Sequence, residues 1–353
     1  MIPRLGGGLR RVAAMALILV GLQAAAVLPA AAEDPPASTC PNPTPVVQGM
    51  TAAVINPTHT VTGTINASGC DIGVYFGPGT TGLVSGANIY GATSFGIFND
   101  GGRVSVYMSR IHDIANPEGD ACGGEESVGI GTAATDDDCS GDNGTGVRRY
   151  IGGKSGTGIL FLGAGARGTI SSNNVFAYGR RGISVSGAGA QAQILGNTIS
   201  GQPPLSGGGH AGRVGIWIAN GALTTITNNR VSDNTTGGSS GEAGSGIMIA
   251  GGPGHNGQPN YTTGVQITSN GLSGNDVGVL LSNVPVLPAI RTRNSVVANI
   301  IQAPPTPSTA GSPPRLAGVK VMGGVGDMVL GNTILGYAAP VYVAPACIGV
   351  IVR

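Results

Sequence analysis

Short apolar runs that alternate with other residues recur along the whole chain. Each run starts with Gly and continues apolar-x-apolar; after a variable stretch there follow an apolar residue, two further residues, Asn, one residue and an apolar residue. One clear copy is Gly182-Ile183-Ser184-Val185, followed by Ile194, Asn197 and Ile199. Apolar side chains that alternate with period two over a few residues are typical of short β-strands that have one buried face. The pattern therefore predicts many short strands joined by turns.

The copies return at a similar interval. Their first glycines are 23 to 40 residues apart, a spacing typical of solenoids, propellers and other arrays. Copies upstream of residue 158 are weaker, the one at Gly129-Ile130 is degenerate, and Gly349-Val350-Ile351-Val352 starts a last one. The first glycines are Gly73, Gly96, Gly129, Gly158, Gly182, Gly215, Gly246, Gly278, Gly318 and Gly349.

The length of the strands decides between these architectures. A propeller blade needs four longer antiparallel strands, whereas a coil of three short parallel strands fits the observed apolar spacing. Stacked coils would also place the repeated asparagines at one corner. Asn tolerates left-handed backbone angles, and stacked amides can hydrogen-bond from coil to coil. The predicted column consists of Asn173, Asn197, Asn229, Asn270, Asn299 and Asn332.

These periodic Gly, Ile/Val and Asn positions resemble the right-handed parallel β-helix repeats of the pectin-lyase-like superfamily. They match no particular enzyme family within it. The resemblance implies an all-β fold, namely a single-stranded right-handed parallel β-helix of about ten coils with long loop insertions. We expect the β-helix to occupy residues 60–353, preceded by an N-terminal arm or cap at residues 33–59.

The first 32 residues have the pattern of a secretory signal peptide. Arg4, Arg10 and Arg11 precede an apolar run at 12–28, and Ala30-Ala31-Ala32 supplies the small residues of a cleavage site. No later apolar stretch is long enough to span a bilayer. We therefore expect a secreted, extracellular protein that has no membrane association after cleavage.

Five cysteines fit an oxidising compartment. Near neighbours pair most readily, which predicts the disulfides Cys40–Cys70 and Cys122–Cys139. Cys347 is left over, and we expect it to pack as a small buried hydrophobic residue.

Composition excludes several classes of protein. The chain has 41% hydrophobic residues, so it does not resemble a disordered chain, and its 64 glycines lack the Gly-X-Y period of collagen. The formal net charge is +1, without the basic surplus of a protein that binds nucleic acid.

The resemblance implies that a polymeric substrate lies in a groove along the sheet of Gly-apolar-x-apolar strands. The outward positions of these strands are mostly apolar and include no carboxylate, so whether the protein is an enzyme stays open. A glycoside hydrolase would need two carboxyl groups at this surface, and a polysaccharide lyase would need a base and cations. The outward positions are Tyr75, Phe98, Leu160, Ser184, Trp217, Met248, Leu280 and Lys320.

Trp217, the single tryptophan, is the first candidate for ligand binding. Its indole could stack on a sugar ring or anchor a partner, or the flanking loops 200–214 and 232–245 could cover it. His210 and Arg213 lie in the first of these loops and could reach a ligand at Trp217, or they could simply be solvated. Arg180 and Arg181 lie in a short turn next to a Gly-apolar-x-apolar strand, where a guanidinium pair could bind the carboxylate of a uronate.

The insertion at 112–157 is rich in acidic residues and offers a candidate Ca²⁺ site. Asp136, Asp137, Asp138 and Asp142 could supply several oxygen ligands. The alternative is a solvated, disulfide-closed loop whose charge binds no metal.

Two functions are consistent with this pattern. The first is a secreted β-helix protein that binds, and could also process, an extracellular polysaccharide. The second is a non-catalytic surface, structural or adhesion protein whose apolar sheet face contacts other proteins. The sequence shows no cap on the last coil, so another chain could cover that coil and form an oligomer.

Overall fold

The computed structural model describes residues 39–114, 156–202, 213–235, 243–252, 260–305 and 316–353. Residues 37–353 form one compact unit, and the predicted leader at 1–32 lies outside the described residues. Every named element in the described part is a β-strand, and none of it is a helix long and apolar enough to cross a membrane.

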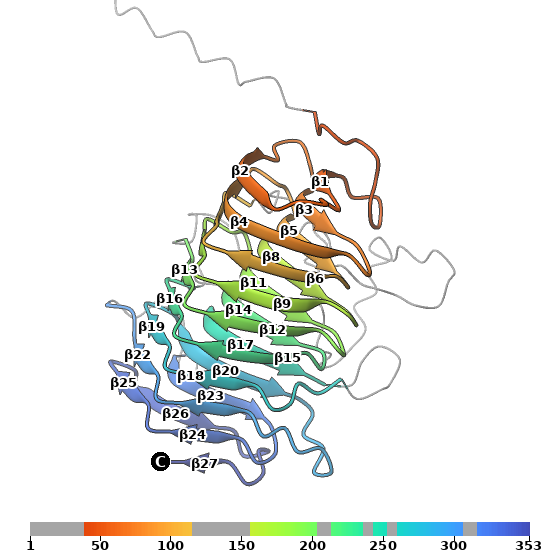
Figure 1. Cartoon of the computed structure of the whole chain (residues 1–353). Helices are drawn as coiled ribbons and strands as arrows, with labels where there is room; N and C mark the ends of the chain where they lie inside the picture. The colour runs from red at the N-terminus through yellow and green to blue at the C-terminus, as the bar shows by residue number, and fades with distance from the viewer. Residues whose placement is uncertain (1–38, 115–155, 203–212, 236–242, 253–259, 306–315) are drawn as a thin grey trace, which may run out of the picture. The chain divides into compact units, whose positions relative to one another are not determined.

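The strands form two parallel sheets that follow the stack of coils (Figure 1). The first sheet has ten strands, one from each coil, which confirms the predicted number of coils. In order along this sheet they are β1 (Ala52–Ile55), β3 (Ile72–Phe76), β5 (Phe95–Asp100), β8 (Thr157–Leu162), β11 (Arg181–Ser186), β14 (Val214–Ala219), β17 (Ser245–Gly251), β20 (Val277–Asn283), β23 (Ala317–Gly323) and β26 (Ala339–Val343).

The second sheet has seventeen strands and bends at a corner, so that most coils contribute a middle strand and a third strand to it. The long strand β4 (Thr81–Tyr90) spans both positions, because it pairs with β6 and with β7, and β2 (Val61–Asn66) pairs with β4. The middle strands are β6 (Arg103–Tyr107), β9 (Arg167–Ser171), β12 (Gln191–Leu195), β15 (Leu223–Thr227), β18 (Gln266–Thr268), β21 (Ser295–Val297), β24 (Met328–Leu330) and β27 (Ile351–Val352). The third strands are β7 (Arg110–His112), β10 (Asn174–Phe176), β13 (Thr198–Ser200), β16 (Arg230–Ser232), β19 (Gly271–Ser273), β22 (Ile300–Gln302) and β25 (Thr333–Leu335).

Aliphatic side chains fill the interior of the coils in columns. In the first sheet, Ile159, Ile183, Ile216, Ile247 and Val279 are register partners in successive strands, and all are fully buried. Burial of each such side chain contributes about 2 kcal/mol to folding. The core therefore lengthens with each coil without becoming wider.

The repeated glycine at the start of each first-sheet strand marks a close approach of neighbouring coils. A Cβ atom added to Gly158 would lie 2.6 Å from the carbonyl oxygen of Gly182, and one added to Gly182 would lie 2.6 Å from that of Gly215. Contacts this short exclude any side chain. The repeat therefore contains Gly because consecutive backbones need the space that a side chain would occupy.

The predicted asparagine column is present at the corner between the middle and third strands. The Asn173 side-chain amide donates to Asn197 Oδ1 at 3.0 Å and to the Val106 carbonyl at 3.0 Å. The same two bonds recur along the column, with Asn197 donating to Asn229 Oδ1 at 2.9 Å and to the Ile170 carbonyl at 2.8 Å. The interpretation of the asparagines as a hydrogen-bonded ladder is confirmed as far as Asn332.

The expectation that the asparagines themselves adopt left-handed backbone angles was wrong. The left-handed backbone angle belongs to the residue before the asparagine, as in Ser172 (φ 57°), Asn228 (φ 57°) and Ala298 (φ 55°). The asparagine itself is selected for its amide, which also accepts a bond from the backbone N–H one coil earlier, for example Asn173 N to Asn197 Oδ1 at 2.9 Å.

Three boundaries differ from those expected. Strand β1 lies inside the expected arm at 33–59 and pairs with β3 of the first sheet, so this sheet starts before residue 60. The copy at Gly129 lies outside the described residues, and in the first sheet β5 pairs directly with β8. Ile351 and Val352 belong to the second sheet as β27, and β26 supplies the first-sheet strand of that coil with Pro340 at the glycine position.

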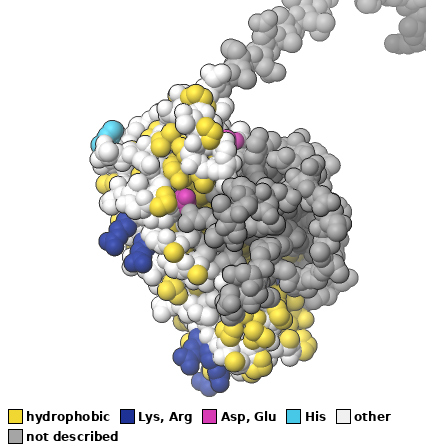
Figure 2. Space-filling model, turned by 90° about the vertical axis from the view of Figure 1, so that its right-hand side faces the viewer, with side chains coloured by type: hydrophobic (Ala, Val, Ile, Leu, Met, Phe, Trp, Pro, Cys, Tyr) yellow, Lys and Arg dark blue, Asp and Glu magenta, His cyan; other side chains and the backbone are white. Residues whose placement is uncertain are grey.

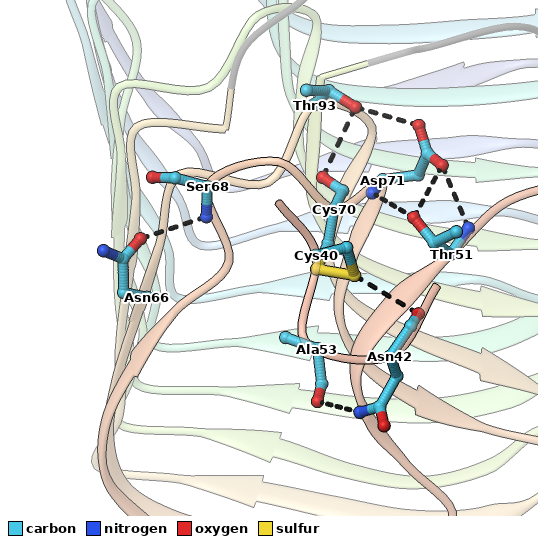
Figure 3. The surroundings of a disulfide bond; sticks show 9 residues. All are labelled: Cys40, Asn42, Thr51, Ala53, Asn66, Ser68, Cys70, Asp71 and Thr93. Carbon is cyan, nitrogen blue, oxygen red and sulfur yellow. Dashed lines mark hydrogen bonds between the residues drawn. A yellow bond between two sulfur atoms is a disulfide. The ribbon is translucent and has the colours of Figure 1, made fainter. Parts of the chain in front are cut away.

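The first turn is fixed by a disulfide between Cys40 and Cys70, which confirms that predicted pair (Figure 3). Hydrogen bonds reinforce this connection: Asn42 donates to the Ala53 carbonyl at 2.6 Å, and Thr51 N donates to Asp71 Oδ2 at 2.9 Å. Cys122 and Cys139 lie outside the described residues. Cys347 is unpaired and half-buried, and it packs against the core as expected.

Asp327 is a carboxyl group buried between the last coils. Its Oδ1 accepts hydrogen bonds from Thr292 Oγ1 and Asn294 N, both at 2.7 Å, and its Oδ2 has no partner among the described residues. Burial raises the pKa of the Asp327 carboxyl, and the hydrogen bonds from Thr292 and Asn294 only partly oppose this shift.

We predict that Asn173→Ala lowers the free energy of unfolding by about 3 kcal/mol, because it leaves several buried backbone and amide groups without partners. The neighbouring Asn174 is exposed at the start of β10, so Asn174→Ala should change the stability by less than about 0.5 kcal/mol. Denaturant titrations of both variants compare the two. Equal losses would contradict the structural role of the ladder.

We also predict a stability difference at Asp327 that depends on pH. A raised pKa in the folded state means that the folded protein holds this proton more tightly than the unfolded chain. Its contribution is therefore present at low pH and is lost as the pH rises through the folded-state pKa. Asp327→Asn removes this loss, so the melting temperature of the variant relative to the parent should rise as the pH increases from about 4, the ordinary pKa of an Asp carboxyl, toward neutral. A constant difference across that range would contradict the prediction.

Candidate functional site

The outer face of the first sheet, where the sequence places the groove, is largely covered. The outward side chains from Tyr75 to Trp217 are at most 5% exposed. Tyr75 and Phe98 meet edge to face with their centroids 5.7 Å apart, and Leu160 belongs to the same buried cluster. Only Met248, Leu280 and Lys320 in the predicted row are half-buried. Among the described residues, the row from Tyr75 to Trp217 therefore presents no open groove, because its large apolar side chains are used for packing.

Trp217 is buried, and most of the flanking loops that the sequence offered as its cover lie outside the described residues. It is 3% exposed and packs in a small cluster with Val214, Ala219 and Ala250. The guanidinium carbon of Arg181 lies 3.6 Å from the centroid of the indole, so the structure brings these two predicted residues together. The cation therefore covers one face of the indole ring.

The Arg213 side chain forms hydrogen bonds to backbone carbonyl groups near Trp217's strand. It is 8% exposed, its Nε donates to the Gly179 carbonyl at 3.3 Å, and its Nη1 donates to the Gln202 carbonyl. Burial lowers the pKa of Arg213, and the nearby Tyr178 opposes that shift. Arg180 is half-buried in the adjacent turn.

The remaining predicted residues lie outside the described part of the chain. They are His210 and the candidate calcium ligands Asp136, Asp137, Asp138 and Asp142. Within the described ranges, no group of three or more His, Cys, Asp or Glu side chains could hold a metal ion.

An open groove lies instead on the outer face of the second sheet. One hollow of about 370 Å³ is lined by Thr81, Gly82, Arg103, Val104, Ser105, Arg167 and Gly168. A second hollow of about 510 Å³ is lined by Arg167, Gly168, Thr169, Gln191, Ala192, Gln193, Leu223, Thr224, Thr225 and Gly264. The two hollows share Arg167 and Gly168, so they form one continuous surface, which we call the middle-strand groove.

The lining of the middle-strand groove follows the register of the sheet. Thr81, Arg103, Arg167, Gln191 and Leu223 are successive partners in β4, β6, β9, β12 and β15. Their side chains therefore form a line along the stack, about 4.8 Å apart. A second line runs beside it through Thr169, Gln193 and Thr225.

A cluster around His112 lies on the third strands of the same sheet. The His112 ring stacks between Tyr90 and Phe176, with centroids at 5.4 Å and 4.9 Å. Its Nδ1 lies 2.6 Å from Asp113 Oδ2, and its Nε2 lies 3.0 Å from Asn88 Oδ1. Arg110 covers the Phe176 ring at 4.8 Å. A hollow of about 570 Å³ adjoins His112 and Arg110.

Sequence reasoning missed both of these features because it concentrated on the Gly-apolar-x-apolar strand. A signal was present in the middle strands, where polar residues alternate with buried ones in Arg103-Val104-Ser105 and Gln191-Ala192-Gln193. This alternation marks a strand with a solvated face.

Several solved structures are similar to this chain in part. The Dettilon tailspike protein gives a TM-score of 0.49 at 14% identity, over 86% of this chain and 55% of that one. The DFA-IIIase from Arthrobacter chlorophenolicus A6 without its lid gives 0.40 at 12% identity, over 85% and 66%. The A-module of the Azotobacter vinelandii mannuronan C-5 epimerase AlgE6 gives 0.28 at 12% identity, over 86% and 76%. The chain thus spans less than two thirds of the first two proteins.

No curated protein matches the sequence. A family model described as "Right handed beta helix region" matches residues 137–336, which is more than half of the chain. This match agrees with the parallel coils, the interior aliphatic columns and the asparagine ladder. The chain belongs to the right-handed β-helix family.

Proposed function

We propose that this chain is a secreted β-helix protein that binds an extracellular polysaccharide along the middle-strand groove. The observation that carries the proposal is the continuous open surface across five successive strands, from β4 to β15. A polymer needs such an extended site, whereas a small ligand is usually enclosed in a cleft.

The chemistry of the groove suits sugar hydroxyl groups. Thr169, Gln191, Gln193 and Thr225 present hydroxyl and amide groups that can both donate and accept hydrogen bonds. Leu223 is 47% exposed at one end and offers an apolar surface for the C–H face of a sugar ring. The parallel ladder fixes the spacing of these groups, so little conformational entropy is lost when a ligand binds.

The proposal is restricted to binding. The strands of the second sheet carry no Asp or Glu. A glycoside hydrolase would place two carboxyl groups beside the scissile bond. The described part of the groove therefore supports recognition of a polymer but gives no basis for assigning its cleavage.

Secretion is part of the same proposal. The Cys40–Cys70 disulfide suits an oxidising compartment, and residues 1–32 have the pattern of an export signal. Both features support secretion, which would bring the groove into contact with an extracellular polymer.

We predict that Gln193→Trp weakens polysaccharide binding by about tenfold or more, because an indole at this central exposed position fills the groove. The purified protein is tested for retention on an array of insoluble and immobilised polysaccharides, and the affinity for the retained polymer is then measured. Gln302→Trp is the matched control, since Gln302 is exposed at the end of β22 and lines neither hollow.

Two outcomes would overturn the proposal. The first is that the parent protein retains no polysaccharide. The second is that Gln193→Trp and Gln302→Trp bind the retained polymer equally well while both keep the β-sheet circular-dichroism spectrum of the parent.

The alternative function, an apolar contact surface for proteins, is favoured by one observation at the last coils. Figure 2 shows hydrophobic side chains gathered at the lower end of the molecule, where Figure 1 places β26 and β27. Several large hydrophobic residues of the last coils are between 37% and 60% exposed. They are Ile300, Leu335, Val343, Ile348, Ile351 and Val352.

If this surface joins protein chains, the molar mass from light scattering should rise with protein concentration. Replacing Ile351 and Val352 together by Thr should then return the protein to its monomer mass, because the contact loses apolar area. A parent protein that stays monomeric up to high concentration would exclude self-association through these coils.

A further inference from the structure

We infer that the polysaccharide bound in the middle-strand groove is acidic, and that Arg103 and Arg167 bind its carboxylate or sulfate groups. This inference rests on the proposed function and adds the chemical class of the polymer. The inference is based on the arginine side chains that lie on the outer face of the second sheet.

The two arginines are direct neighbours in the sheet. Arg103 of β6 and Arg167 of β9 are register partners in consecutive coils, and both side chains are exposed. Parallel strands lie about 4.8 Å apart, so the two guanidinium groups repel each other when no anion lies between them. Both arginines line the groove, and Arg167 lines both hollows.

No acidic side chain on the described strands of the second sheet neutralises this pair. The strands of this sheet contain Arg103, Arg110, Arg167 and Arg230 but no Asp or Glu. Neither Arg103 nor Arg167 forms an ion pair with another described residue. The groove therefore has a positive centre that a bound anion would stabilise.

The geometry of the side chains suits an acid group on a sugar. A guanidinium group presents parallel N–H donors that bind a carboxylate or sulfate through two oxygens, and it stays charged at all relevant pH values. Thr81 precedes the arginines in the same line, and Gln191 follows them. A polymer lying along the stack would thus place acid groups at the centre and hydroxyl groups at both ends.

Nucleic acid is the other common polyanion, and the groove fits it less well. Single-stranded nucleic acid is usually bound by aromatic side chains on which the bases stack. The lining of the two hollows includes Thr, Ser, Gln, Arg and small apolar residues but no aromatic ring. The observations therefore favour a polysaccharide.

The experiment compares polymers that differ in charge. Binding of the full-length mature protein to polygalacturonate, heparin and neutral dextran is measured by calorimetry or affinity electrophoresis. We expect both acidic polymers, or the one whose acid group fits, to bind at least about tenfold more tightly than dextran. This preference should shrink when sodium chloride is raised from about 0.05 M to 0.5 M, because salt screens exposed charges.

Substitutions then test whether Arg103 and Arg167 cause the preference for acidic polymers. The double variant Arg103→Gln/Arg167→Gln should lose about tenfold or more in affinity for the acidic polymer, since two charge-assisted hydrogen-bonding groups are removed. Arg230→Gln is the matched control, because Arg230 is an exposed arginine of the same sheet that lines neither hollow. Arg103→Lys/Arg167→Lys keeps the charge without the planar fork and should bind with intermediate affinity.

The outcomes separate this inference from the proposed function. The inference is overturned if dextran binds as tightly as the acidic polymers, if the double Gln variant binds them like Arg230→Gln, or if a DNA oligonucleotide binds more tightly than either acidic polymer. In the first two cases a loss of binding in Gln193→Trp would leave the proposed function intact. If no polysaccharide binds the parent protein, the proposed function fails and the inference fails with it.

Discussion

The coil-to-coil amide ladder is the interaction on which the other features of this fold depend. The turn between the middle and third strands contains a residue with a left-handed backbone angle, and a buried residue follows it, as Asn173 follows Ser172. The backbone N–H of this buried residue has no partner within its own coil. The asparagine of the following coil supplies the missing partner. Asn197 Oδ1 accepts a hydrogen bond from the backbone N–H of Asn173, and the Asn197 side-chain amide donates to the carbonyl of Ile170, in the same coil as Asn173. Neighbouring coils are therefore held in register at a corner where strand pairing is interrupted.

A fixed register has consequences on both faces of the sheets. Inside, it aligns aliphatic side chains such as Ile183 and Ile216 in columns. Outside, it aligns whatever side chains the strands carry, so that Arg103 lies beside Arg167 and Gln191 follows in the same line. The same backbone constraint thus builds the core and arranges the groove, and the chemistry of the groove depends only on which residues occupy the outward positions.

The two sheets use their outer faces differently. The first sheet carries large apolar groups such as Tyr75, Phe98 and Trp217, which are buried in clusters of their own. The middle strands carry short polar groups and arginines, which stay in contact with solvent. Burial of aromatic surface is favourable, whereas burial of an unpaired guanidinium is costly, so the first face is covered and the second stays open.

The sequence by itself determined the repeat, the fold and the asparagine ladder, because each depends on side chains at fixed intervals within a single coil. It also determined the Cys40–Cys70 pair, whose partners are near neighbours along the chain. Only the tertiary structure decided which outward face is open, where β27 pairs, and that Arg103 meets Arg167 across 64 residues of chain. These features depend on which coils become neighbours, and insertions of variable length between the strands hide that from any local pattern.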